Sequence, residues 1–531
     1  MLNLLLFSCA RVGAPNGGTR DSLAPKFLGS NIDTTRLNVS RTVKELRLDF
    51  DEYVMLKDFN KNFNVSPPIK KIKKVIPSNL ANKYVLIQWE DTLQANTTYN
   101  FNFGNAIVDN NESNPLPYFN FAFSTGDKID DLFVSGTVKD AMTLIKENQT
   151  AKDNKMVVGL YKAGENLDYK QKPDYITKVD EENYFELNFL PKGEFVIIAF
   201  DDENQNSVYD AGKEKVSFLK EKITLDSTSV RGLKLKLYPS KKVVKYKESK
   251  AINGGLLMTF EGNPETVDVK SLSEDLKDFK VTHAKRSDSV NIWFDAEKSN
   301  LGGTVSKQVK LSYFTPTISD TISVSYKAVK DEFKLSNEAG NLIAPENNFV
   351  INTSLPIENL NTSSWKLESD SIAQDFTAKI SEKNPFKILV NSSFKPTKKY
   401  VLTIPKETVS SYYSSNDKSF QFQFEIDKPE NYGSFTAVIK NKPTAKFWVE
   451  LTNEKGEILY SQFTNALEVS FKNLKPATYI ARIRVDNNGN GFWDEADFAQ
   501  NIAAEDVYIF EKEINVRPLW EIKEDWELIN H

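Results

Sequence analysis

The sequence predicts an all-β protein built from tandem β-sandwich domains, and three observations support this fold class. First, apolar and polar residues alternate in the segments YNFNFGN (99–105), FNFAFST (119–125), LKLKLYP (233–239) and FQFQFEI (420–426). Such alternation is typical of antiparallel strands with one buried face. Second, convincing helical periodicity is nearly absent from the sequence. Third, the 20 tyrosines and 35 phenylalanines favour strands over helices.

The length and charge of the chain bound both its organisation and its partners. With 531 residues, the chain is long enough for several domains. Its net charge of −5 is mild for this length. Nucleic-acid-binding domains usually carry a strongly basic face, so the composition predicts no nucleic-acid partner.

Histidine and cysteine are scarce, and this scarcity argues against most enzymatic mechanisms. The histidines are His283 and His531, and the single cysteine is Cys9. A Ser–His–Asp relay, a Cys–His pair or a zinc cluster has almost nothing to be built from. We therefore predict no catalytic residue and no enzymatic activity. A hydrolase that uses only carboxylates, for which the acidic segment 48–56 offers candidates, is the minor alternative.

The first ten residues, MLNLLLFSCA, place a short apolar run directly before Cys9. This arrangement resembles the lipobox of bacterial lipoproteins, which is cleaved before the cysteine and lipidated on its sulfur. The resemblance implies a signal remnant over 1–8, a lipid anchor on Cys9 and a flexible Gly- and Pro-rich tether over 9–23. The usual basic segment before the apolar run is missing, so the true start would lie upstream of Met1. The alternative is an ordinary N-terminus with a chance cysteine.

Strand and turn patterns divide the rest of the chain into five predicted β-domains. They span 24–128, 130–240, 251–339, 340–428 and 430–528. One internal repeat pairs the first domain with the fourth, because LQANTTYNFNF (93–103) matches FKPTKKYVLTI (394–404). A turn followed by a Tyr-led strand is typical of the end of an immunoglobulin-like sandwich. The basic segment 240–250 is predicted to be a solvated linker.

A second and sharper repeat pairs the second domain with the fifth. In each copy a leucine ends a strand, and an aspartate lies twelve positions later: Leu190 and Asp202 in one, Leu474 and Asp486 in the other. Identical spacing is hard to ascribe to chance, so we predict one fold for both domains.

The stretch VDNNGNGFWDEAD (485–497) has the spacing of a calcium-binding loop. Its candidate ligands at positions 1, 3, 5, 7, 9 and 12 are Asp486, Asn488, Asn490, the backbone carbonyl of Phe492, Asp494 and Asp497. Gly491 at position 6 permits the tight turn, and hard oxygen donors in this number suit calcium rather than zinc or copper. We predict a structural calcium ion, because the loop has no nucleophile. The alternative is an Asx-rich turn that binds nothing.

The corresponding loop of the second domain is a weaker metal candidate. It offers Asp202, Asn204, Asn206 and Asp210 at positions 1, 3, 5 and 9. Ser207 stands where the later loop has glycine, and Lys213 takes position 12. Both differences predict weaker cation binding than in the later loop.

Several segments together resemble a known family. They are LDFDEYV, LQANTTYNFNFGNAIVDNNESNP and FAFSTGD near the N-terminus, and DNNGNGFWDEADF and PLWEIKEDWEL near the C-terminus. They resemble the Ig-like-domain lipoproteins of Bacteroidota, which carry an SbsA-type Ig-like domain at the N-terminus. The repeated module resembles the prealbumin-like or Cna B-type sandwich, in which a similar Asp/Asn loop binds calcium. The resemblance implies an outer-membrane lipoprotein but no reaction, and leaves surface or periplasmic orientation open.

These observations predict a non-enzymatic, lipid-anchored scaffold or accessory subunit of an outer-membrane complex for assembly, secretion or uptake. Its partners would be outer-membrane β-barrel or other envelope proteins, with the lipid on Cys9 inserted in the membrane. The alternative is a glycan-binding or adhesive cell-surface module. Trp520 and Trp526 would then stack on sugars, although packing in the protein interior is the commoner role of such residues.

Overall fold

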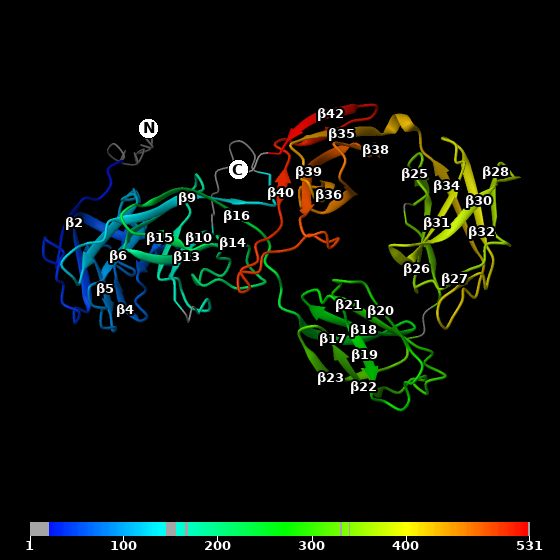
Figure 1. Ribbon diagram of the computed structural model, residues 1–531, viewed down its shortest axis with the longest axis horizontal. Coiled ribbons are helices and arrows are strands. Elements are labelled where there is room, and N and C mark those ends of the chain that lie inside the picture. Colours follow the sequence, from blue (N-terminus) through cyan, green and yellow to red (C-terminus); the bar gives the residue numbers. More distant parts are fainter. Residues whose placement is uncertain (1–20, 145–154, 165–167, 330–331, 339, 529–531) are drawn as a thin grey trace, which may run out of the picture. The chain divides into compact units, whose positions relative to one another are not determined.

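The computed structural model describes residues 21–144, 155–164, 168–329, 332–338 and 340–528. Cys9, the predicted lipidation site, lies outside these residues. Within them the chain is nearly all strand, and the helices are the single turns α1 (Phe59–Asn62) and η1 (Pro429–Asn431) (Figure 1). No helix in this part of the chain has the length and apolar character that crossing a membrane requires. The predicted all-β fold of tandem sandwiches is confirmed.

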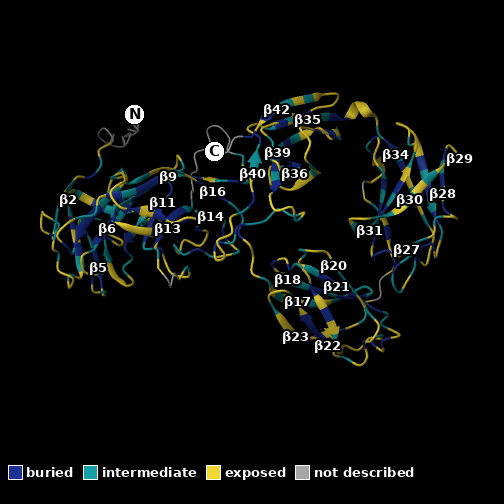
Figure 2. Cartoon of the chain, viewed as in Figure 1, coloured by how far each residue is buried: buried dark blue, intermediate teal, exposed yellow. Residues whose placement is uncertain are grey.

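Five hydrophobic clusters occur among the described residues, and each draws side chains from two sheets. We call the corresponding parts the first to fifth sandwich in chain order. The buried positions alternate with exposed ones along most strands, as a half-buried sheet requires (Figure 2). The chain divides into two compact units, and the second contains the chain from Tyr238 onward. The five-domain boundaries stay a prediction.

The first and fourth sandwiches, which the sequence predicts to be repeats, have matching strand orders. The first has sheets β1-β2-β5-β4, with β7 on β2, and β3-β6-β8. Its strands are β1 (Phe27–Ser30), β2 (Glu45–Leu56), β3 (Asn64–Ser66), β4 (Ile72–Ile76), β5 (Asn82–Trp89), β6 (Thr98–Gly104), β7 (Ile107–Asp109) and β8 (Phe119–Ser124).

The fourth sandwich has sheets β24-β26-β31-β30 and β25-β34-β32-β28-β29, with the small ladder β27-β33. Its strands are β24 (Leu335–Asn337), β25 (Leu342–Ile343), β26 (Phe349–Thr353), β27 (Asn359–Leu360), β28 (Lys366–Ser369), β29 (Ile372–Ala373), β30 (Phe376–Ser381), β31 (Asn384–Ser392), β32 (Lys399–Ile404), β33 (Val409–Ser410) and β34 (Phe420–Ile426).

A buried tyrosine occupies the same place in both of these sandwiches. The hydroxyl of Tyr99 accepts a hydrogen bond from the N–H of Gln94 at 2.9 Å, and that of Tyr400 accepts one from Lys395 at 2.8 Å. Each hydroxyl therefore fixes the turn five residues before its ring, in the manner of the tyrosine corner of immunoglobulin-like sandwiches. This contact explains why the Tyr-led strand marks the repeat in the sequence.

The second and fifth sandwiches also share one strand order. In the second, β12-β9-β16 faces β11-β10-β13-β14, with β15 on β13; in the fifth, β38-β35-β42 faces β37-β36-β39-β40, with β41 on β39. The second comprises β9 (Leu132–Asp140), β10 (Met156–Lys162), β11 (Tyr175–Lys178), β12 (Tyr184–Leu190), β13 (Gly193–Asp201), β14 (Val216–Phe218), β15 (Ile223–Leu225) and β16 (Val230–Leu237). The fifth comprises β35 (Gly433–Lys440), β36 (Lys446–Thr452), β37 (Ile458–Thr464), β38 (Glu468–Leu474), β39 (Ala477–Asp486), β40 (Val507–Ile509), β41 (Ile514–Val516) and β42 (Glu521–Glu527).

The third sandwich has sheets β17-β18-β21-β20 and β19-β22-β23. Its strands are β17 (Lys245–Ile252), β18 (Gly255–Glu261), β19 (Asp268–Ser271), β20 (Lys280–His283), β21 (Ser289–Trp293), β22 (Lys307–Phe314) and β23 (Ser319–Tyr326). The prediction of a solvated linker over 240–250 is wrong from Lys245 onward. The lysines of β17 face solvent, while Tyr246 packs against Phe260 and Tyr313 and so ties the strand to the hydrophobic cluster.

The three sandwiches of the second unit contact one another pairwise. Trp293 of β21 is 3% exposed and belongs to the hydrophobic cluster of the fourth sandwich, where it packs near Phe386. The side-chain amide of Asn473, in the fifth sandwich, donates to the carbonyl of Pro345, at the fourth, at 2.8 Å. The third and fifth sandwiches meet at the Asp/Asn loop described below.

Candidate functional site

The later Asp/Asn loop begins where β39 ends, and Asp486 is both the last residue of that strand and the first residue of the loop. Its side chain is buried, at 3% exposure. One carboxylate oxygen accepts the N–H of Asn490 and the other accepts that of Gly491, each at 3.0 Å. Asp486 therefore curls the loop back on itself, and the φ of +82° at Gly491 permits this turn.

Three predicted ligands converge on one point of the loop. The side-chain amides of Asn488 and Asn490 both donate to the same oxygen, Oδ2, of Asp494. Burial alone would raise the pKa of Asp494, but hydrogen bonds from Asn488 and from Arg286 outweigh it and lower that pKa below its ordinary value. Asp494 is therefore held as a carboxylate with its inner oxygen turned toward positions 3 and 5.

The other two predicted ligands have different surroundings. The carboxylate of Asp497 accepts the N–H of Gln500 at 3.2 Å, and its backbone pairs with Ile502. The N–H of Phe492 donates to the side-chain oxygen of Asn490 at 2.7 Å. Phe492 thus belongs to the curl of the loop, whereas the recorded partners of Asp497 lie on its C-terminal side.

Glu505 is a loop residue that the sequence analysis missed. It is 6% exposed, and its two carboxylate oxygens accept the N–H groups of Asn488 at 3.1 Å and Asp494 at 2.9 Å. Burial raises its pKa, although these N–H groups favour the ionised form. Glu505 lies eleven residues beyond Asp494 and arrives only because β40 pairs with β39, with Val507 opposite Arg484.

The sequence repeat between the second and fifth sandwiches contains a pattern that could have predicted Glu505. Glu505 precedes Val507 by two positions, and Val507 pairs with the residue two before Asp486. In the second sandwich Glu214 precedes Val216 by two positions, and Val216 pairs with Phe200, two before Asp202. Glu214 is also buried, at 2% exposure. Matching the glutamates to the strand that follows each loop would have identified both.

The earlier loop repeats the hydrogen bonds of the later one. The buried carboxylate of Asp202 accepts the N–H groups of Asn206 and Ser207, each at 3.0 Å, and the amide of Asn204 donates to Asp210. Ser207 adopts a φ of +60°, the left-handed conformation that Gly491 adopts in the later loop. The two loops therefore have the same fold, and serine carries a conformational cost that glycine avoids.

A cation from another sandwich reaches the later loop. The guanidinium of Arg286, between β20 and β21, donates to Oδ1 of Asp494 at 2.6 Å, and it also bonds Glu265. The same guanidinium lies 4.6 Å from the ring centre of Phe492, close enough for a cation–π contact. Phe492 and Asp494, at positions 7 and 9 of the loop, therefore both contact the third sandwich.

The donor set of the later loop fits a hard cation. The side chains of Asn488, Asn490 and Asp494 meet at one point. If the two amide groups rotated so that their oxygens replaced their N–H groups at this point, the loop would present oxygen ligands to an ion. Among the described residues, no three His, Cys, Asp or Glu side chains form a group that could hold a metal ion. A cation would therefore depend on amide and backbone oxygens, which favours calcium over softer metals.

The first sandwich is similar to a known domain family. Residues 21–125 match the Bacterial Ig-like domain family. The matched residues contain every strand from β1 to β8. No curated protein is similar enough in sequence to the chain to count as a relative.

Solved structures similar to the chain include several multi-domain proteins. The S-layer protein rSbsC(31-844) is 11% identical, with 93% of this chain and 67% of that chain covered and a TM-score of 0.15. SGBP-B of the Bacteroides ovatus mixed-linkage glucan utilization locus is 9% identical, with 73% and 94% covered and a TM-score of 0.20. BcpA, the major pilin subunit of Bacillus cereus, is 10% identical, with 75% and 99% covered and a TM-score of 0.14. At these TM-scores none of the three superposes on the whole chain.

Proposed function

We propose that this protein is a non-enzymatic, lipid-anchored scaffold or accessory subunit of an outer-membrane protein complex. The observation that carries the proposal is the set of pairwise contacts among the third, fourth and fifth sandwiches. Trp293, Asn473 and Arg286 each join a different pair. Contacts of this kind restrict the movement of the three sandwiches relative to one another. We therefore favour a role in which several of their surfaces bind one partner together.

Structural calcium fits this role. Asp494 bonds Arg286 through Oδ1 and the loop amides through Oδ2, so a cation in the loop would brace the contact between the third and fifth sandwiches. We assign Asp486, Asn488, Asn490, Asp494 and the carbonyl of Phe492 to this cation, and Asp202, Asn204, Asn206 and Asp210 to a weaker second one. Asp497 is the least favoured of the predicted ligands, because its recorded partners, Gln500 and Ile502, lie on the C-terminal side of the loop.

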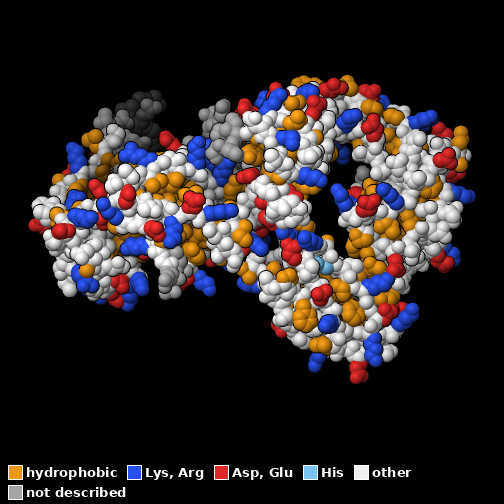
Figure 3. Space-filling view, viewed as in Figure 1, with side chains coloured by type: hydrophobic (Ala, Val, Ile, Leu, Met, Phe, Trp, Pro, Cys, Tyr) orange, Lys and Arg blue, Asp and Glu red, His pale blue; other side chains and the backbone are white. Residues whose placement is uncertain are grey.

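The surface is compatible with protein partners. Acidic and basic side chains are interspersed over the face seen in Figure 3, and hydrophobic side chains are exposed between them. Such mixed surfaces suit protein contacts better than binding to a uniformly charged polymer.

Co-purification tests the scaffold role. The full-length chain with a C-terminal tag, expressed in its native host, is solubilised from membranes, captured and identified with its partners by mass spectrometry. We expect one or a few envelope proteins in near-stoichiometric amount, and their loss with Cys9→Ser, which removes the proposed anchor. Recovery of the wild-type chain alone would contradict the proposal.

Glycan binding is the second candidate, and one observation favours it. Trp520 is 48% exposed, and because the guanidinium of Arg517 lies over one face of its ring, 4.8 Å from the ring centre, a sugar would stack on the other face. Trp526, the other predicted platform, is buried at 4% exposure in the hydrophobic cluster of the fifth sandwich. A glycan array probed with the wild-type chain and with Trp520→Ala tests this role; signals that survive the substitution would exclude Trp520 as the platform.

A further inference from the structure

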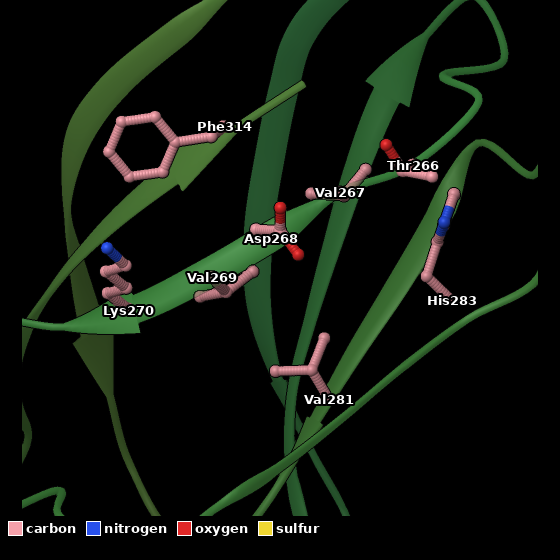
Figure 4. Close-up of a pocket in the computed structure, with 8 residues that line it drawn as sticks. All are labelled: Thr266, Val267, Asp268, Val269, Lys270, Val281, His283 and Phe314. Carbon is pink, nitrogen blue, oxygen red and sulfur yellow. The ribbon is translucent and has the colours of Figure 1, made fainter. Parts of the chain in front are cut away.

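The third sandwich is open along one side, where edge strands of its two sheets lie next to each other. β19 ends the sheet β19-β22-β23, and β20 ends the sheet β17-β18-β21-β20. Two hollows, of about 610 and about 510 Å³, follow β19 along its length and share Val269 and Lys270 in their walls. We call these two neighbouring hollows together the β19 groove. Figure 4 shows β19 crossing this groove, with Val281 and His283 of β20 on one side.

The two sides of β19 present different chemistry to the groove. Val267 and Val269 are buried, at 6% and 9% exposure, and with the half-buried Val281 they form an apolar wall. Asp268 and Lys270 are exposed on the alternate positions, as the two-residue period of a strand requires. The Lys270 ammonium lies 5.5 Å from the ring centre of Phe314, which keeps its side chain along the strand (Figure 4).

The backbone of β19 has a free edge. β19 pairs with β22, from Asp268 opposite Phe314 to Ser271 opposite Leu311, and no second strand pairs with it among the described residues. An edge of this kind carries N–H and C=O groups that another strand can satisfy. By contrast, the edge strand β4 of the first sandwich carries the adjacent like charges Lys73 and Lys74, an arrangement that discourages added strands.

We propose that the β19 groove binds an extended segment of a partner protein, which joins the sheet as an antiparallel fourth strand. The opposite charges of Asp268 and Lys270 select the segment: an acidic residue opposite Lys270, a basic residue opposite Asp268, and apolar residues between and beside them facing Val267, Val269 and Val281. The proposal names the kind of partner that the scaffold engages and rests on the scaffold function for its biological purpose. The peptide experiment below examines the groove alone, so its failure leaves the co-purification result standing.

A synthetic peptide provides the probe. In antiparallel register, the capped sequence Thr-Val-Glu-Val-Lys-Val-Thr places its glutamate opposite Lys270 and its lysine opposite Asp268. We expect the fluorescein-labelled peptide to bind the full chain in an anisotropy titration. We expect the charge-reversed peptide, with lysine and glutamate exchanged, to bind about fivefold more weakly. Hydrogen exchange should slow at the backbone amides of 266–272 in the complex.

A charge-reversed protein makes the test reciprocal. Asp268 and Lys270 are exposed, so the double variant Asp268→Lys, Lys270→Glu should fold normally, and its peptide preference should switch. A peptide N-methylated at alternate residues loses backbone donors and should not bind if strand addition is the mode. The single substitution Asp320→Lys, on the opposite edge strand β23 of the same sheet, is the control for a change of charge away from β19 and should leave the preference between the two peptides unchanged.

Three kinds of result would overturn the proposal. One is a dissociation constant weaker than about 1 mM for the designed peptide. Another is equal binding of the N-methylated peptide, or a preference that does not switch with the protein charges. The third is protection of 266–272 by a linear oligosaccharide such as cellohexaose while the peptide has no effect, which would assign the groove to glycans.

Discussion

The guanidinium of Arg286 lies 2.6 Å from the carboxylate of Asp494, although 208 residues separate them in the chain. Both side chains are mostly shielded from solvent, at 22% and 25% exposure. This ion pair makes the predicted calcium loop of the fifth sandwich part of a contact with the third. The loop therefore affects the contact between the third and fifth sandwiches, as well as the stability of the fifth sandwich itself.

Replacing Arg286 should loosen that contact. Arg286→Ala leaves Asp494 partly buried without its charged partner, and we expect the free energy of unfolding to fall by about 1–3 kcal/mol. Urea unfolding followed by tryptophan fluorescence measures the change. Lys298→Ala is the control, because Lys298 is 81% exposed beside Asp295 and its loss should cost at most a few tenths of a kcal/mol. Equal effects of the two substitutions would refute a special role for Arg286.

Calcium should stabilise the protein through the later loop. At a calcium concentration about 100 times the dissociation constant, the expected gain in the free energy of unfolding is about 2.7 kcal/mol, seen as a higher melting temperature than with chelator. Asp486→Ala should abolish this gain, because Asp486 anchors the curl of the loop. Asp497→Ala should retain most of it. Identical melting temperatures with calcium and with chelator would show that the loop is a turn that binds no calcium.

The left-handed conformation of Gly491 should be costly for any other residue. Its φ is +82°, and a Cβ there would meet no heavy atom within 4 Å, so the penalty of Gly491→Ala is conformational rather than steric. We expect a loss of about 1 kcal/mol in the free energy of unfolding without calcium. Gly29→Ala, which also has open space but no left-handed φ, should be nearly neutral. A neutral Gly491→Ala would contradict the described loop conformation.

The raised pKa of Glu505 predicts how its contribution to stability depends on pH. Because the folded-state pKa exceeds the ordinary value of 4.5, the folded state binds more protons than the unfolded state between the two values. In chelator, the stability of the wild type relative to Glu505→Gln should therefore rise as the pH falls from 8 through the raised pKa, and level off below about 4.5. Melting temperatures of both proteins across this range measure the difference. If the stability of the wild type relative to Glu505→Gln fell as the pH is lowered, the raised pKa of Glu505 would be contradicted.

Trp293 should stabilise two sandwiches at once. Its ring is 3% exposed, in the hydrophobic cluster of the fourth sandwich, and its indole N–H donates to Thr282 of the third at 2.8 Å. We expect Trp293→Ala to cost about 3–5 kcal/mol and to lower the calorimetric transitions of both sandwiches. The exposed Trp520→Ala is the control for loss of an indole. Destabilisation confined to the third sandwich would contradict a shared cluster.

Sequence reasoning succeeded where the relevant contacts are local. The Tyr-led strands of the first and fourth sandwiches were visible because the hydroxyls of Tyr99 and Tyr400 bond only five residues back. The side chains at positions 3, 5 and 9 of the later loop also meet within a few residues of one another, while the cation that they would bind stays a prediction. Sequence reasoning failed for 245–250, because lysines on the solvent face of β17 masked the apolar contacts of Tyr246.

The sequence by itself determined the all-β class, the two repeats and the curl of the Asp/Asn loops, since strand periodicity and turn chemistry depend on residues a few positions apart. Only the tertiary structure decided that Glu505 and Arg286 complete the later loop and that Trp293 enters the fourth sandwich. It alone placed β19 beside β20 to form a groove. Those contacts depend on strand pairing and on how sandwiches meet, and both are set by burial of side chains distant in sequence.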